Sequence, residues 1–230
     1  MSTAGLLPRL AAAQSSDVDT VPASMVGSNA FALAVGPSTP DTVHTLKDNV
    51  AWAGGNPTNA AFGSPAAAAT PHFVGMMLAK ASGVALTHVP RRGDAPGIPD
   101  LLGGYVLAFV STLGSFIPHI RCHGLRLLVL SGTSRKAGVP DVPTCPEQGN
   151  PIDNIERRGI FFRMGTPPEA VQRIGSAVQA EVTLPDFVKL LADVGLTPQA
   201  STPSSLAQRV HDENEPWRVD IKMLGFTGQS

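Results

Sequence analysis

The chain has 230 residues, of which 43% are hydrophobic and 15% charged, and its formal net charge is −1. This composition predicts a well-packed protein of one large or two small domains, and it excludes a disordered chain. Lysine and arginine form no basic stripe, so we expect no nucleic-acid partner. No apolar run approaches the length needed to cross a bilayer.

Strands and helices alternate along the chain. Apolar runs bounded by turn residues predict strands at 31–35, 59–62, 86–89, 105–110, 125–130 and 159–163. Helical spacing and start signals predict helices at 40–52, 71–81 (capped by Thr70), 96–102, 113–121, 167–182, 185–194 and 203–224, the last bent at Pro216. The alternation predicts an α/β fold with mostly parallel strands and helices on both faces of the sheet.

A loop of small residues, Ser64 to Thr70, leads directly into the second predicted helix. Small side chains let a ligand approach the backbone, and the start of a helix offers unpaired N–H groups to an anion. An ordinary helix cap at Thr70-Pro71 is the alternative interpretation. Ser111 and Thr112 follow another predicted strand, where either a ligand contact or a simple turn fits the sequence.

The cysteines and histidines match no metal-binding motif. We expect Cys122 and Cys145 to be unpaired and to behave as small apolar residues, and a disulfide between them is the alternative. Four histidines, His72, His88, His119 and His123, lack the patterned spacing of a zinc site. His72 and His119 lie in predicted helices, where histidines more often have structural roles. We therefore expect no metal and no cofactor. No Asp–His pair can be assigned to Ser64, so we expect no catalytic nucleophile there.

Several short motifs in fixed order resemble the substrate-binding proteins of tripartite tricarboxylate transporters, the Bug family. The resemblance runs from about Thr20 to the C-terminus. The matching segments are Gly63-Ser64-Pro65 with His72, Thr87 to Pro90, Asp100 to Gly104, Pro118 to Ile120, Leu125-Arg126, Val139 to Thr144 and Gly165 to Pro167.

The resemblance implies a two-lobed fold like that of type II periplasmic binding proteins. One lobe would comprise residues 36–158, and residues 1–35 with 159–230 would form what remains of the other. It also implies a periplasmic protein without catalysis, which binds a small carboxylate and acts with a membrane permease. The ligand-binding residues it implies are Ser64, Ala67, Ala68, Ala69, Thr70, His72, Ser111 and Thr112.

Three departures from the family favour a second hypothesis. The family has a further segment ahead of the position of Thr20, a glycine-rich loop where this chain has Ala66 to Ala69, and an export signal. Here Pro8 and Arg9 interrupt the N-terminal apolar residues, which leaves retention in the cytoplasm open. The alternative is therefore a truncated relative without transport function, acting as a structural or interaction protein or as a homodimer.

Overall fold

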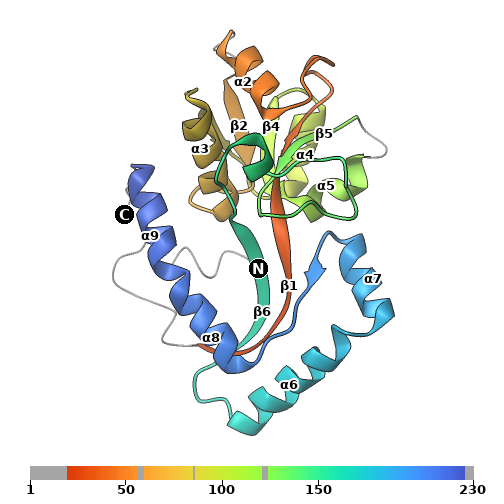
Figure 1. Ribbon diagram of the computed structural model, residues 1–230, viewed down its shortest axis with the longest axis vertical. Coiled ribbons are helices and arrows are strands. Elements are labelled where there is room, and N and C mark those ends of the chain that lie inside the picture. Colours follow the sequence, from red (N-terminus) through yellow and green to blue (C-terminus); the bar gives the residue numbers. More distant parts are fainter. Residues whose placement is uncertain (1–19, 56–59, 85, 121–123, 226–230) are drawn as a thin grey trace. The chain divides into compact units, whose positions relative to one another are not determined.

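The computed structural model describes residues 20–55, 60–84, 86–120 and 124–225. The chain divides into two compact units, residues 30–155 and residues 1–29 with 156–230. It passes from one unit to the other within strand β1 (Thr20–Val35) and at the start of strand β6 (Ile155–Arg163) (Figure 1). No helix among the described residues is long and apolar enough to cross a membrane.

Residues 30–155 form a twisted sheet with the strand order β3-β2-β4-β1-β5. Its other strands are β2 (Ala61–Ser64), β3 (Thr87–Pro90), β4 (Ala108–Thr112) and β5 (Arg126–Leu130). Strand β2 runs parallel to β3 and β4, because a helix returns the chain to the same end each time. Strand β1 is antiparallel to both β4 and β5, with Phe31 opposite Thr112. The prediction of mostly parallel strands was therefore wrong for the two pairings of β1, since an apolar run does not reveal strand direction.

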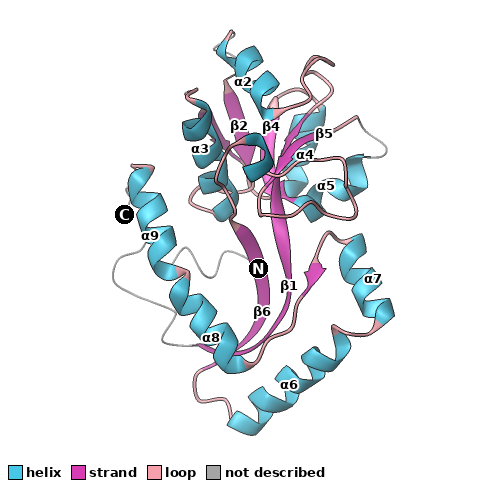
Figure 2. Cartoon of the chain, viewed as in Figure 1, coloured by secondary structure: helices cyan, strands magenta, loops and turns pink. Residues whose placement is uncertain are grey.

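The helices cover both faces of this sheet, as predicted (Figure 2). They are α2 (Leu46–Gly54), α3 (Thr70–Ser82), α4 (Asp94–Leu102) and α5 (Leu113–Ile120). Successive side chains of β1 point to opposite faces, so Phe31 and Leu33 join one buried cluster with α2 and α3. Ala32 and Ala34 join a second cluster with α4 and α5. The fold is thus a helix–sheet–helix sandwich with an apolar core on each face.

The starts of α2 and α3 differ from the predictions, and α4 begins at Asp94, two residues before its predicted start. Thr45 caps α2 and forms a reciprocal capping box with Asp48, so the predicted start at residue 40 was wrong. The predicted cap at Thr70 was also wrong. Ala69 occupies the N-cap of α3 without a side-chain hydrogen bond, and Thr70 is the first helical residue.

The other unit is built from short helices around the first half of β1. Its helices are α6 (Pro168–Glu181), α7 (Pro185–Asp193), α8 (Pro203–Asp212) and α9 (Asn214–Met223). Strands β6 and β7 (Thr197–Pro198) both pair with β1. The single helix predicted for 203–224 is two helices, and Pro216 lies in the first turn of α9, where its missing N–H is harmless.

Candidate functional site

The carboxyl ends of three parallel strands meet at one edge of the sheet. Ser64 ends β2 and pairs with Pro90 at the end of β3, and Thr112 ends β4. Gly63 of β2 pairs with Phe109 of β4, which fixes the relative position of these strands. Ligands of open α/β sheets bind beyond such an edge. Both sequence-predicted groups, the loop from Ser64 to Thr70 and the Ser111-Thr112 pair, therefore start from the same edge.

Free backbone donors gather in the loop that leads into α3. The N–H groups of Ala66, Ala67, Ala69 and Thr70 donate to no acceptor among the described residues. Ala69 is the N-cap of α3 and Thr70 is its first residue, where the backbone dipole adds partial positive charge. The arrangement suits an anionic group such as a carboxylate.

Ser64, the first residue of this loop, and His72, in the first turn of α3, both form hydrogen bonds with the loop. Ser64 is fully buried, and its Oγ lies 3.1 Å from the carbonyl oxygen of Ala66 and 2.8 Å from His88 Nε2. His72 is also buried, and its Nδ1 accepts the N–H of Ala68 at 3.1 Å. Both side chains therefore fix the shape of the loop.

The rings of His72 and His88 are stacked, with centroids 3.7 Å apart and planes 19° apart. Burial lowers the pKa of His72. Burial and the nearby His72 lower the pKa of His88 to about 4. Both rings are therefore neutral near pH 7. The sequence singles out His88 as a candidate metal ligand and as part of the Thr87 to Pro90 motif, and a histidine in a short strand gives no sign of such a stack.

The Ser111 side chain belongs to a second polar group at the same edge. Asp94, at the start of α4, accepts from Ser111 Oγ and from Ser115 Oγ, each at 2.7 Å. The Thr112 hydroxyl lies 3.1 Å from Ser115 Oγ. The N–H of Gly93 donates to the carbonyl oxygen of Pro65, so this group adjoins the loop. Asp94 and Ser115 were not predicted from the sequence, because polar residues near the start of a helix are typical of ordinary caps.

The described residues contain no group of three or more histidine, cysteine or acidic side chains that could hold a metal ion. Cys145 is a buried free thiol, and burial raises its pKa to about 12. His123 and Cys122 lie outside the described residues.

Two helix-covered units joined by paired strands, with anion-suited backbone at a sheet edge, define a solute-binding fold of the periplasmic type. The sequence matches the family described as "Tripartite tricarboxylate transporter family receptor" over residues 6–226, and the chain belongs to this family. The family is one of receptors, not of enzymes, in agreement with the prediction.

Known proteins agree with this assignment. The chain is 30% identical over 196 residues to the "UPF0065 protein in gbd 5'region" of Cupriavidus necator, covering 85% of this chain and 59% of the relative. It is 27% identical over 208 residues to "Protein BugT" of Bordetella pertussis, covering 90% of this chain and 63% of that protein. The solved structure "R. palustris Rpa4515 with adipate" superposes with a TM-score of 0.85 at 25% identity, covering 91% of this chain and 70% of that one. The chain thus spans about three fifths of the length of these curated relatives.

Proposed function

We propose that this chain is the solute-binding receptor of a tripartite tricarboxylate-type transporter and binds a small carboxylate on the loop from Ser64 to Thr70. The observation that carries the proposal is the set of four free N–H groups in the loop that leads into α3, at the carboxyl edge of the sheet. Ala67, Ala69 and Thr70 would contact the ligand through the backbone. Ser64, Ala68 and His72 would hold the loop in shape, and Ser111 and Thr112 would line the adjoining edge.

The relatives support the ligand class and the partner. The structure of Rpa4515, to which the chain is similar, is described with adipate, a dicarboxylate. The family description names a transporter receptor. We infer from it a membrane permease as partner and the periplasm as the site of action.

Thermal unfolding against a panel of mono-, di- and tricarboxylates at pH 8 tests the proposal. A ligand at a hundred times its Kd adds about 2.7 kcal/mol to the free energy of unfolding. For a chain of this size that corresponds to a rise in Tm of roughly 5–10 °C. A saturable rise with at least one carboxylate is expected. The absence of a rise with all of them, in a protein that unfolds cooperatively, would overturn the proposal.

A pair of variants at one position separates backbone from side-chain binding. Ala69 has the extended ψ of 162° that a following proline requires, so Thr70→Pro removes one N–H while the helix start is kept. We expect it to weaken binding about tenfold, the effect of one hydrogen bond to a charged group. Thr70→Val, which removes only the hydroxyl, is the matched control and should bind more tightly than Thr70→Pro.

The alternative of a structural protein or homodimer rests on a different observation. Around α7, Leu184, Leu190 and Val194 are each about half exposed, although they are large apolar residues. Exposed apolar groups of this kind favour association. Light scattering over a concentration series tests it, and a monomer at every concentration would remove the homodimer.

A further inference from the structure

We propose that neutral His72 is a positioning residue for the carboxylate loop, and that protonation of its Nδ1 releases Ala68 and weakens ligand binding in acid. The effect on ligand binding rests on the proposed function, whereas the hold of His72 on Ala68 rests on the geometry of the loop alone.

Ala68 is the part of the loop that needs to be held. Its φ is 57°, and it is the one non-glycine residue with a positive φ in the described part of the chain. The left-handed conformation is unfavourable for a residue with a β-carbon, so a specific contact has to keep it there. The backbone conformation of Ala68 sets the directions of the neighbouring N–H groups of Ala67 and Ala69 relative to each other.

The contact that holds Ala68 depends on the protonation state of one ring nitrogen. Ala68 donates its N–H to His72 Nδ1 at 3.1 Å. An imidazole nitrogen accepts only while it carries no hydrogen, so the neutral ring has its proton on Nε2. Protonation at Nδ1 would place two donors face to face. The hydrogen bond would then be replaced by repulsion, and Ala68 would be free to return to a negative φ.

The surroundings of His72 keep it neutral until the solution is acidic. His88 stacks on one side of the ring, and Phe73 also stacks on it, with centroids 5.3 Å apart. Burial lowers the pKa of both histidines, and the second ring lowers that of His88 further, to about 4. A proton on either ring therefore disfavours a proton on the other.

The charged groups on the elements packed around the pair are few. Strands β2 and β4 carry no titratable side chain, and α3 carries only Lys80 besides His72, near its far end. On α4, Asp94 accepts from Ser111 and Ser115, and Asp100 pairs with Arg91, which follows β3. These two carboxylates are engaged by partners other than the histidines.

NMR of the full chain without ligand tests the structural part. The ring signals of His72 and His88 and the amide signal of Ala68 are followed from pH 8 to pH 4. We expect the Ala68 amide to shift with the same midpoint as His72, below the ordinary value of about 6.5. An Ala68 amide that ignores the His72 titration would overturn the inference, whether or not a carboxylate binds.

Binding measurements test the consequence with one substitution and one control. In His72→Asn, the amide oxygen replaces Nδ1 as acceptor for Ala68 but does not titrate. The ligand is the carboxylate that raises Tm at pH 8. For each protein, the ratio of its Kd at pH 4.5 to its Kd at pH 7 is measured. We expect this ratio to be at least about ten times larger for the wild type than for His72→Asn. Because both proteins bind the same ligand, ionisation of the ligand changes the two Kd values equally and does not affect the comparison. His211→Gln, at an exposed histidine of α8, should keep the wild-type profile.

The outcomes separate the two proposals. Parallel pH profiles for wild type and His72→Asn would overturn the role of His72 while the carboxylate site remained. The absence of binding at pH 8 would overturn the proposed function, and the NMR titration would still decide whether His72 holds Ala68.

Discussion

At the scale of single residues, Ala68 combines a left-handed backbone with a β-carbon. Glycine adopts this conformation without steric cost, whereas alanine loses about 1–2 kcal/mol there. Glycine also gives the unfolded chain more freedom, which offsets about half of the gain. We therefore expect Ala68→Gly to raise the free energy of unfolding by about 0.5–1 kcal/mol in urea titrations.

The neighbouring alanine provides the control. Ala67 is exposed and its φ is not positive, so Ala67→Gly should lower the free energy of unfolding by about 0.5 kcal/mol. Equal effects of the two substitutions would contradict the strained backbone at Ala68. The alanine run also shows a limit of the sequence, because alanine gives no sign that one of four successive residues is left-handed.

At the scale of elements, the contact between α3 and β2 depends on a glycine. A β-carbon at Gly75 of α3 would lie 2.1 Å from Cε2 of Phe62, whose ring is fully buried. Alanine normally stabilises a helix interior by about 1 kcal/mol relative to glycine. Here we expect Gly75→Ala to destabilise the protein by about 1–3 kcal/mol, because the buried ring has to shift.

Gly54 at the end of α2 is the matched position without this contact. Its nearest neighbour, Val84 Cγ2, is 4.0 Å from the added β-carbon. Gly54→Ala should therefore leave stability unchanged or raise it by up to about 1 kcal/mol. If both alanine variants stabilised the protein in urea titrations, the close packing of α3 on β2 would be disproved.

The same elements show what the sequence could and could not predict. The bounds that apolar spacing predicted for α3 and β2 lie within about two residues of the observed bounds, because one face of each element is buried in the same core. Strand β1 was predicted only from Phe31 onward, although it begins at Thr20, since its first half lacks a continuous apolar run. The loop from Ser64 to Thr70 stays a predicted site. The contact of Ser64 with His88 and that of Ser111 with Asp94 could not be predicted, because they join residues 24 and 17 positions apart in the sequence.

At the scale of the whole molecule, stability should fall in mild acid. The folded pKa of His88 is about 4, below the ordinary value near 6.5, so its contribution is fully present above pH 6.5. As the pH falls from 6.5 toward 4, the unfolded chain binds protons that the folded chain does not. Since His88 is only half-buried, the loss should stay below the ~1.4 kcal/mol per pH unit of a full shift.

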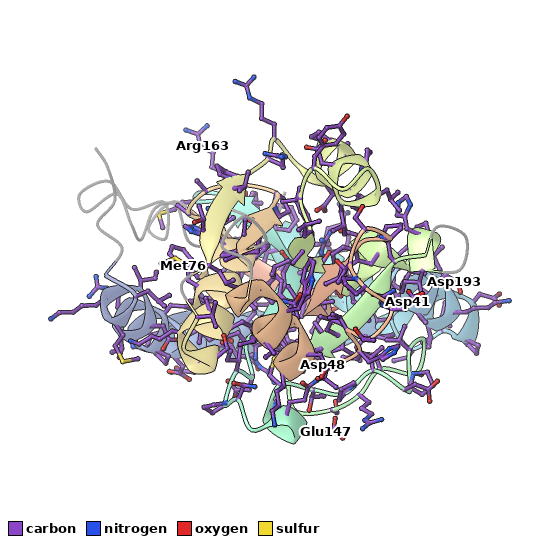
Figure 3. The ribbon with its side chains drawn as sticks, turned by 90° about the horizontal axis from the view of Figure 1, so that it is seen from above. Asp41, Asp48, Met76, Glu147, Arg163 and Asp193 are labelled. Atoms are coloured by element: carbon purple, nitrogen blue, oxygen red, sulfur yellow. The ribbon has the colours of Figure 1, made fainter. Side chains whose placement is uncertain are left out.

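Urea unfolding at pH 7.5, 6 and 5 measures this loss. Asp48 and Glu147, labelled in Figure 3, also have a lowered pKa, from hydrogen bonds to Thr45 and Thr144, respectively. Their contributions are fully present well above their ordinary pKa values of 3.8 and 4.5 and are lost as the pH falls below them, so they change little between pH 7.5 and 5. His88→Gln should flatten the dependence between pH 7.5 and 5. An unchanged slope in this variant would contradict the lowered pKa of His88.

The two units should also differ in local stability. Eleven of the twelve largest fully buried side chains in the described part of the chain belong to residues 30–155, and only Met25 lies outside them. Among the described side chains, helices α6 to α9 each bury only one, namely Val171, Leu191, Leu206 and Ile221, respectively. Regions with few buried apolar contacts open at lower free energy. Amide hydrogen exchange should therefore be slowest in β4, β5 and the second half of β1, and markedly faster in α6 to α9. Equal protection of α7 and β4 would contradict this, since it would require apolar contacts of α7 beyond those of the single chain.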